Sequence, residues 1–211
     1  MPDTNQKNKL KFKLKRCYYA PATIDEDTGV VSYQKPVRIP LSVSVTLNPK
    51  GDLIKIYADG QEYIIGRDNG GYDGEAEMYR VPENFEVDCL GAIRNSNGII
   101  SENANAKSSP FALLFEFEGD AKAIRHCMYL CYANRFTVDG TNSESKTPTS
   151  EKLSIISRPR ADGWVKTKTG DSTEKEAYDN WYNAVPEPPS TEAETATVNN
   201  GEPETNEQSE E

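Results

Sequence analysis

The chain has 211 residues, of which 36% are hydrophobic and 27% charged, a composition typical of one globular domain with extensions. No apolar run approaches the roughly 20 residues of a membrane span, and the chain begins without the apolar core of a signal peptide. We therefore expect a protein made and kept in the cytoplasm with reduced cysteines. The net charge of −10 disfavours sequence-independent duplex binding, which requires many Lys and Arg residues against the phosphates.

The charge is unevenly distributed, and this divides the chain into three parts. Residues 187–211 contain eight glutamates and no basic residue, and the segment from Pro186 on has one Val and no aromatic residue. Such a segment buries too little apolar area to offset the entropy of ordering, so 186–211 is predicted to be a disordered acidic tail. A recruitment function for this tail stays open, without a motif to support it. Residues 1–8 are predicted to be a flexible arm, which leaves 9–185 as the folded domain.

Strand patterns dominate the first half of this domain. Residues 9–15 alternate strictly, with Leu10, Phe12 and Leu14 on one face and four lysines on the other. Residues 37–47 alternate in the same way and place Leu41, Val43, Val45 and Leu47 inward, while Pro40 indicates an edge strand or a bulge. The runs 53–57 and 62–65 flank Asp59-Gly60, a strong hairpin signal. Further strands are predicted over 75–81, after Asn97-Gly98, and on both sides of Asp162-Gly163.

Two segments have helical patterns. Pro82 suits a first helical position, and Phe85, Cys89, Leu90 and Ile93 share a face that Gly91 limits to a short helix. Near the end of the domain, Thr173 and Glu176 have the spacing of a capping box, and an apolar stripe follows through Val185. This second helix is expected to pack across a sheet. The fold class is therefore mainly β, a sandwich or barrel with one or two short flanking helices.

Residues 110–140 predict the central pair of strands, because the first run is apolar on one face and the second is largely apolar on both. This pair also holds the chain's only histidine, His126, and two of its four cysteines. On a strand Cys127 and Cys131 lie about 13 Å apart, too far for a disulfide or one tetrahedral metal. We expect buried, inert thiols, and a His126 whose neighbour Cys127 points to the opposite face.

No other motif carries chemistry. The stretch 66–71 lacks the Gly-Lys-Ser/Thr ending of a phosphate-binding loop, and 68–75 misses the EF-hand spacing, which leaves calcium as a weak option. Glu116 and Glu118 lie two apart on the polar face of a strand, where glycosidase acids sit but solvated acids are commoner. We expect no catalytic, cofactor or metal site, and no enzyme activity.

Several segments, taken in order along the chain, resemble the major tail proteins of long-tailed phages with non-contractile tails. They are 15–20, 29–33, 36–40, 45–51, 57–60, 69–74, 82–85, 98–105, 110–120, 124–135, 158–166 and 178–185. No single segment is diagnostic, but the collinear series covers about 170 residues. The lysine-rich start and the acidic tail are extensions beyond this common part.

The resemblance implies the tail-tube fold, two packed antiparallel sheets with a helix, shared with type six secretion tube proteins. It implies a structural virion protein: six copies form a ring, and stacked rings form the hollow channel for DNA delivery. The partners would be further copies of the chain, a tape-measure protein and tail-tip or terminator proteins, with transient non-specific passage of DNA and no membrane. The locations would be the virion tail and, before assembly, the host cytoplasm.

The resemblance also assigns residues. A loop near the first hairpin bridges rings in that family and matches 48–74 here, so we expect Tyr57, Tyr63 and Asp68 in or near such contacts. Lys11 and Lys13 are further candidate interface residues, with protection of an edge strand as their alternative role. An acidic channel repels DNA phosphates, and Glu75, Glu116 and Glu118 are its candidate lining. A non-catalytic carbohydrate-binding β-sandwich and an enzyme using His126, Cys127 and Glu116 remain as alternatives.

Overall fold

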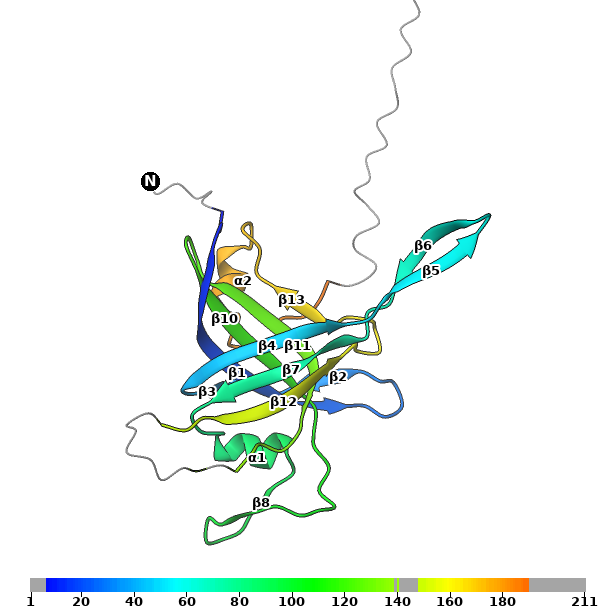
Figure 1. Cartoon of the computed structure of the whole chain (residues 1–211). Helices are drawn as coiled ribbons and strands as arrows, with labels where there is room; N and C mark the ends of the chain where they lie inside the picture. The colour runs from blue at the N-terminus through cyan, green and yellow to red at the C-terminus, as the bar shows by residue number, and fades with distance from the viewer. Residues whose placement is uncertain (1–6, 139, 141–147, 190–211) are drawn as a thin grey trace, which may run out of the picture.

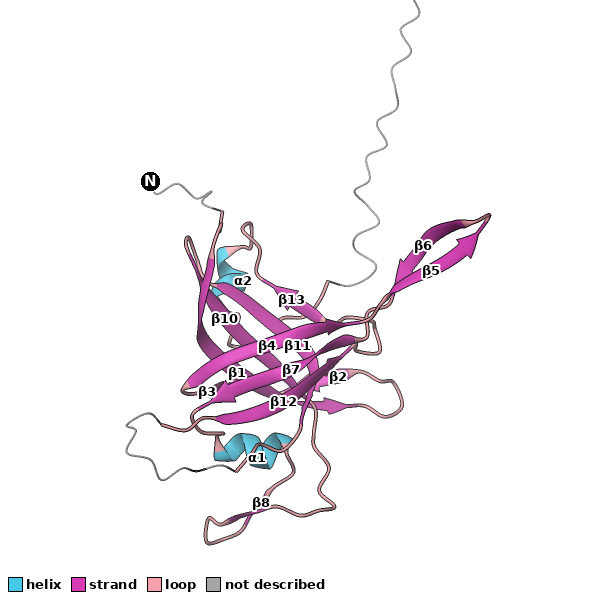
Figure 2. Ribbon diagram, in the orientation of Figure 1, coloured by secondary structure: helices cyan, strands magenta, loops and turns pink. Residues whose placement is uncertain are grey.

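The computed structural model describes residues 7–138, 140 and 148–189, and shows a mainly β fold with two short helices, as predicted (Figures 1 and 2). The strands are β1 (Lys11–Ile24), β2 (Val31–Tyr33), β3 (Val37–Ile39), β4 (Ser42–Lys50), β5 (Leu53–Ala58), β6 (Gln61–Arg67), β7 (Gly71–Met78), β8 (Ile93–Arg94), β9 (Ile100–Ser101), β10 (Phe111–Gly119), β11 (Ile124–Ala133), β12 (Glu151–Arg158) and β13 (Lys166–Lys168). The helices are α1 (Glu83–Cys89) and α2 (Lys175–Asp179). No helix in these ranges is long and apolar enough to cross a membrane.

One nine-stranded antiparallel sheet builds the body. Its order is β2-β1-β10-β11-β12-β7-β4, with β3 added to β1 and β13 added to β11. The sheet bends so that β4, β7 and β12 cross in front of β1, β10 and β11 in Figure 1. The resemblance implied two packed antiparallel sheets, whereas the structure has one continuous antiparallel sheet whose two halves lie one in front of the other. The hairpins β5–β6 and β8–β9 pair only internally and lie outside this sheet.

The predicted central pair is confirmed, because β10 and β11 are neighbours in the middle of the sheet and are buried on both faces. On the inner face, Phe111, Leu113 and Phe115 join residues of β1, β7, β12 and α1 in the larger core. On the outer face, Ala112 and Leu114 pack with Tyr129 beneath the chain that follows α2. Both faces of one pair are therefore covered, each by a different part of the chain.

A bulge in β11 separates the two cysteines of this pair. The register passes from Leu113 opposite Met128 to Phe111 opposite Cys131, so β11 has one extra residue between these positions. Cys131 consequently lies in the inner core, whereas Cys127 lies in the outer one. The two thiols are separate, as predicted. Because of the bulge, they also lie on opposite faces of the sheet.

The helices match the sequence patterns in part. Pro82 precedes α1, and Gly91 follows it at a φ of 78°, as expected of a left-handed helix end. Ile93 does not continue the buried face of that helix but is 62% exposed in β8. The second helix lacks its capping box, because the Thr173 hydroxyl accepts from the amide of Gly170. Trp181 and Val185, beyond its end, do pack across the sheet as predicted.

The turn predicted at Asp59-Gly60 and the edge or bulge predicted at Pro40 are confirmed. Asp59 and Gly60 have φ values of 53° and 75°, which form the tight hairpin turn between β5 and β6. Pro40 ends β3, and β4 begins after it as an edge strand, so the single strand predicted over 37–47 is two strands. Leu41 between them has a φ of 54°, a left-handed conformation that is uncommon for a residue with a side chain.

Four residues on the apolar faces of these predicted strands are exposed, two of which, Leu41 and Val43, were predicted to point inward. They are Leu10 at 57%, Phe12 at 52%, Leu41 at 70% and Val43 at 40%. Their partners in the same alternating patterns, Leu14, Val45 and Leu47, do pack against the core. The alternation therefore identified the strands correctly. The core of the chain, however, covers only the part of each apolar face that includes Leu14, Val45 and Leu47.

The predicted ends of the domain lie partly outside the described residues. Of the arm predicted over 1–8, Asn8 is held in place, because its side chain accepts from the backbone amides of Ala121 and Lys122 at 2.9 and 3.1 Å. Of the tail predicted over 186–211, residues 186–189 are described, and Glu187 lies 3.6 Å from Arg160. The assignment of 190–211 as disordered stays a prediction.

We expect Gly74→Ala to destabilise the fold, because a Cβ at this position would lie 1.9 Å from the carbonyl oxygen of Thr46 on β4. Separating β4 from β7 to relieve this overlap should lower the free energy of unfolding by about 1–3 kcal/mol in urea denaturation. Gly66→Ala is the matched control, since its Cβ would meet only Ile54 Cδ1 at 3.7 Å. Equal stability of the two variants would contradict the close approach of β4 and β7.

Candidate assembly surfaces

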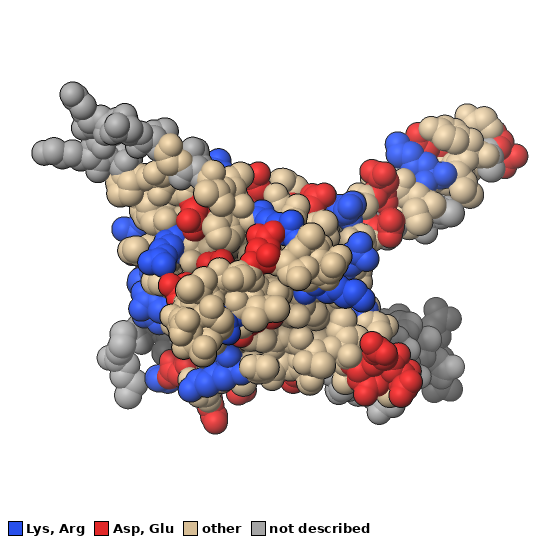
Figure 3. All heavy atoms as spheres, turned by 90° about the horizontal axis from the view of Figure 1, so that it is seen from below, with Lys and Arg blue, Asp and Glu red and all other residues tan. Residues whose placement is uncertain are grey.

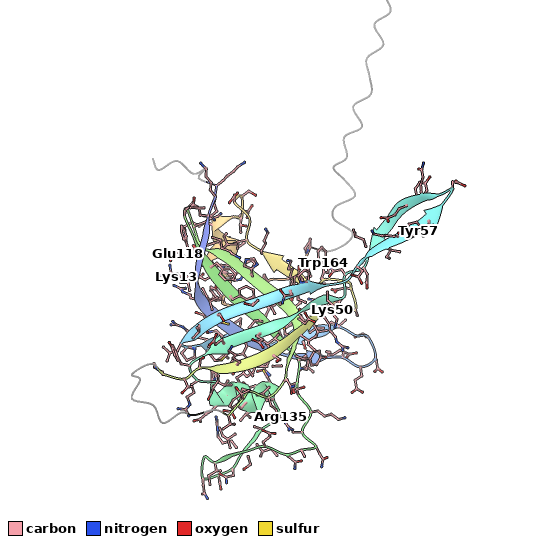
Figure 4. All side chains as sticks on the ribbon, viewed as in Figure 1. Lys13, Lys50, Tyr57, Glu118, Arg135 and Trp164 are labelled. Atoms are coloured by element: carbon pink, nitrogen blue, oxygen red, sulfur yellow. The ribbon has the colours of Figure 1, made fainter. Side chains whose placement is uncertain are left out.

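The hairpin β5–β6 projects from the body as an arm, defined here as residues 53–67 (Figures 1 and 3). Figure 4 shows Lys50 at its base and Tyr57 well out along it. Five large apolar side chains of the arm are exposed, namely Leu53, Ile54, Ile56, Tyr57 and Tyr63. Such a concentration of uncovered apolar surface on a slender hairpin indicates a contact with another molecule.

The arm also carries an ordered polar cluster. The hydroxyl of Tyr57 donates to Glu62 Oε2 at 2.8 Å, and Lys55 Nζ lies 2.8 Å from the other carboxylate oxygen. The hydrogen bonds from Lys55 and then Tyr57 lower the pKa of Glu62. Tyr57 is 75% exposed, so this cluster presents an aromatic ring beside a carboxylate.

The three interface residues predicted for this region all lie on or beside the arm. Tyr57 and Tyr63 are on its two strands, and Asp68 is exposed at its base, where its amide donates to the Asp52 carbonyl at 2.9 Å. Ile54 and Ile56 were not among the predicted interface residues, because the alternating pattern of a strand does not tell whether its apolar face is covered. Whether these residues contact a second copy stays a prediction.

The lysine-rich start of β1 does not keep the single lysine face that was predicted. The pairing of β1 with β10 shifts register twice between Lys11 and Arg16, which changes the direction of successive side chains. Lys11 Nζ lies 4.4 Å from the centre of the Phe117 ring, while Lys13 Nζ lies 3.8 Å from Glu118. With Leu10 and Phe12 exposed beside them, these lysines are part of a mixed apolar and basic surface.

The outer face of β4, β7 and β12 is largely polar, with exposed Ile156 opposite Asp73 and Lys152 opposite Glu77. Cross-strand partners align in rows such as Thr46, Glu75 and Ser154. Three acids alternate along β7 on this face, Asp73, Glu75 and Glu77, and Glu75 is exposed. Asp73 lies 4.0 Å from Lys50, and Glu77 accepts hydrogen bonds from Ser150 and Ser44, the first of which lowers its pKa most. This acidic row is part of the described surface of a single subunit.

Glu116 does not belong to any solvated face, and its prediction as a channel-lining residue is wrong in this respect. Its side chain is 2% exposed and lies on the outer-core side of β10, opposite the inner-facing Phe115. Arg125 Nε approaches it at 3.0 Å, Arg16 Nε at 3.4 Å, and the Tyr182 hydroxyl donates to it at 3.1 Å. These arginine and tyrosine partners, distant in sequence, compensate the burial of the Glu116 carboxylate. The side chain of Glu118, by contrast, is 42% exposed.

The same cluster joins the end of the domain to the central strands. The Arg125 guanidinium lies 3.7 Å from the Tyr178 ring centre and also donates to the Tyr178 carbonyl oxygen. Tyr182 stacks on Tyr18 with ring centres 4.3 Å apart. The carboxylate, the guanidinium and three tyrosine rings therefore hold α2 and the residues after it against β1 and β11.

We expect Glu116→Gln to lower the free energy of unfolding by about 3–5 kcal/mol, because it removes one partner of a buried ion pair and leaves Arg125 uncompensated. Glu118→Gln, two residues along the same strand, removes only an exposed pair with Lys13 and should cost less than about 1 kcal/mol. Urea denaturation of both variants tests the difference. A Glu116→Gln variant as stable as Glu118→Gln would show that the carboxylate is not held as a buried charge.

His126 lies in the wall of a cavity of about 440 Å³ at the inner face of β11. Its ring stacks on Phe115 at 5.1 Å and meets the edge of Phe117 at 5.7 Å. Burial, followed by the charges of Lys166, Lys168 and Lys11, lowers the pKa of His126 to about 4. The ring is therefore neutral at physiological pH, and it does not face Cys127 or Glu116, both of which lie on the other side of the sheet.

This environment predicts a pH dependence of stability. The folded state binds a proton at His126 only near pH 4, whereas the unfolded chain does so near 6.5. The stabilising contribution is therefore complete above pH 6.5 and is lost as the pH falls toward 4. We expect the wild type to lose about 2 kcal/mol more than His126→Gln between pH 7.5 and pH 5 in denaturant titrations. Parallel pH profiles for the two proteins would contradict the neutral, desolvated ring.

The thiols are placed as predicted. All four cysteines are free and buried, and burial raises the pKa of Cys17 and of Cys131 to about 12. Within the described ranges, no group of three His, Cys, Asp or Glu side chains is arranged to hold a metal ion. His126 lies on the opposite face of the sheet from Cys127 and Glu116, so these three side chains do not form one site.

Comparisons with known proteins do not assign the chain to a family. No protein-family model matches it, and no curated protein does so either. Among solved structures, it is similar to the tube-terminating cap of the anti-feeding prophage, determined by cryo-EM. The alignment has 10% sequence identity and a TM-score of 0.42, and it covers 81% of this chain and 99% of the cap chain. At these values the similarity establishes no function.

Proposed function

We propose that the chain is a structural virion protein, the major tail subunit of a long-tailed phage with a non-contractile tail. Copies form hexameric rings, and the rings stack into the hollow channel through which DNA is delivered. The observation that carries this proposal is the arm, which extends beyond the body of the subunit and exposes five large apolar side chains. A subunit with such an arm is built for contact with another copy rather than for chemistry in a pocket.

Two further features support self-assembly. In the described chain, β4 is paired on one side only, with β7, so its other edge offers backbone groups to a further strand. The exposed Leu10 and Phe12 next to lysines provide another uncovered apolar surface. Heterologous contacts made through different surfaces of one subunit produce rings where they close and filaments where they do not.

The outer face of β4, β7 and β12 is the proposed channel lining. This face also carries Lys50, which pairs with Asp73, and Lys152 opposite Glu77, so the exposed Glu75 is the acid proposed to repel the phosphate backbone. Glu118 is partly exposed and remains a candidate, whereas Glu116 is excluded by its burial. A tape-measure protein and tail-tip or terminator proteins would be the partners, and the subunit would be in the host cytoplasm before it joins the virion tail. No catalytic role is proposed.

The test is electron microscopy of the wild type and of an arm-deleted variant. Lys50 and Gly71 are ladder partners, so an Asn-Gly turn in place of residues 51–70 closes β4 and β7 directly and preserves the body. We expect stacked rings from the wild type, assembled with its tail-initiation proteins where needed, and no stacks from the variant. A cryo-EM map of the stacks also shows which face lines the channel. Wild-type protein without tubes in the presence of those partners, or tubes unaffected by the deletion, would contradict the proposal.

A further inference from the structure

The cavity beside His126 lies between the two halves of the bent sheet. β4 and β7 line it from one half and β10 and β11 from the other, while β1 and β13 each contribute a lysine. Its volume of about 440 Å³ is within the range of small-molecule sites in proteins, roughly 300–1,000 Å³. Its apolar lining consists of Val45, Leu47, Tyr72, Phe115, Phe117 and Met128. Most of the wall is therefore suited to an apolar or aromatic group.

Three lysines surround this cavity. Lys11 and Lys166 line it, and Lys168 is the ladder partner of the histidine, so these two side chains lie on the same face of the sheet. Lys11 Nζ lies 4.4 Å from the centre of the Phe117 ring, and Lys166 Nζ lies 4.4 Å from that of Tyr72. These ring contacts hold two ammonium groups against the aromatic walls.

The three lysines lack counter-charges. None of them forms an ion pair with a carboxylate of the described residues. The whole chain has 34 acidic and 24 basic side chains, so acids are in excess overall. All three lysine charges add to the effect of burial in lowering the pKa of His126, and no carboxylate opposes them. The cavity is thus a positive region of an acidic protein.

Acids on the neighbouring segments point away from the cavity or are engaged elsewhere. Asp73 and Glu118 each follow a cavity-lining residue on a strand, so their side chains lie on the opposite face. There they pair with other lysines at 4.0 and 3.8 Å. Asp120 and Asp171 accept hydrogen bonds from backbone amides at the start of the folded chain, at 2.9 and 3.3 Å. An apolar cavity with unbalanced cations is complementary to a ligand that is both apolar and anionic.

We propose that this cavity binds a small amphipathic anion, an aromatic or short aliphatic body that carries one carboxylate or sulfonate group. The body packs against Phe115 and Phe117, and the anionic group lies between Lys11 and Lys166. The ring of His126, in the same wall, lies next to the bound anion. The site is complete in one subunit, so the inference goes beyond the proposed function and does not depend on ring assembly.

Naphthalene-2-sulfonate is the probe for this site, because its sulfonate stays ionised at every pH used. His126 is the chain's only histidine, so its imidazole gives one assignable proton NMR signal in the full-length, unassembled protein. We expect the probe to shift that signal saturably, with one molecule bound per chain and a Kd of roughly 10–100 µM. Probe bound on the exposed apolar arm, outside the cavity, would not give this shift.

The bound sulfonate should also raise the pKa of His126. Its negative charge offsets the lysines and favours the imidazolium, so the pKa should move from about 4 toward 6.5. NMR pH titrations with and without saturating probe measure this change. A purely apolar ligand in the same cavity would not raise the pKa, because further desolvation disfavours the charged ring.

Two double variants with the same change in net charge test the lysines. Lys11→Gln combined with Lys166→Gln should weaken probe binding roughly ten- to a hundredfold, because two cations next to the sulfonate are lost. Lys35→Gln combined with Lys107→Gln is the matched control and should leave the Kd unchanged, since neither lysine lines the cavity. All four lysines are exposed, so both proteins should remain as stable as the wild type in urea denaturation.

Two analogues test the two halves of the ligand. Naphthalene-2-sulfonamide lacks the charge and methanesulfonate lacks the aromatic body, so each should bind at least roughly tenfold more weakly than the probe. The inference is overturned if the His126 signal shows no saturable shift with millimolar probe, if either analogue binds as tightly as the probe, or if the Lys11 and Lys166 double variant keeps wild-type affinity. None of these outcomes bears on tube formation, so the proposed function is tested separately.

Discussion

The fold depends on the central pair β10–β11 being apolar on both faces. A pair of this kind is unstable unless each face is covered, and the chain supplies two different covers. The other half of the bent sheet and α1 close the inner face, while the residues after α2, through Val185, close the outer one. Glu116, the one buried carboxylate among the described residues, lies where this second cover meets the sheet, and its arginine and tyrosine partners come from both sides of that junction.

Covering the central pair uses most of the large apolar side chains and leaves the outlying strands only partly packed. The start of β1, the turn before β4 and the arm all have apolar residues that one subunit does not bury. Other exposed apolar side chains lie elsewhere: Val30 precedes β2, Ile93 and Ile99 lie on and beside the hairpin β8–β9, and Ile156 is on β12. The described residues therefore form a closed interior and several separate uncovered apolar surfaces.

Sequence patterns predicted where strands and turns lie better than they predicted which side chains are buried. The turns at Asp59-Gly60, Pro40 and Gly91 were predicted correctly because glycine permits a positive φ at little cost, whereas proline fixes its φ and removes a backbone donor. Burial is a tertiary property, so the alternation at Leu10 and Leu41 did not reveal that their faces stay uncovered. Glu116 was misplaced for a related reason: its partners Arg125 and Tyr182 are 9 and 66 residues away, and nothing near it in the sequence marks the pairing. The bulge that places Cys127 and Cys131 on opposite faces likewise had no local signal.

The base of the arm has a mechanical consequence. Side chains are excluded there by close backbone approaches: a Cβ on Gly51 would lie 2.2 Å from the Asp68 carbonyl oxygen, and one on Gly71 would lie 2.0 Å from that of Ser157. The two connecting segments are thus clamped to each other and to β12, so the arm leaves the body at an angle that the twist of β4 and β7 dictates. If copies stack through the arm as proposed, this fixed exit angle would contribute to the rotation from one copy to the next.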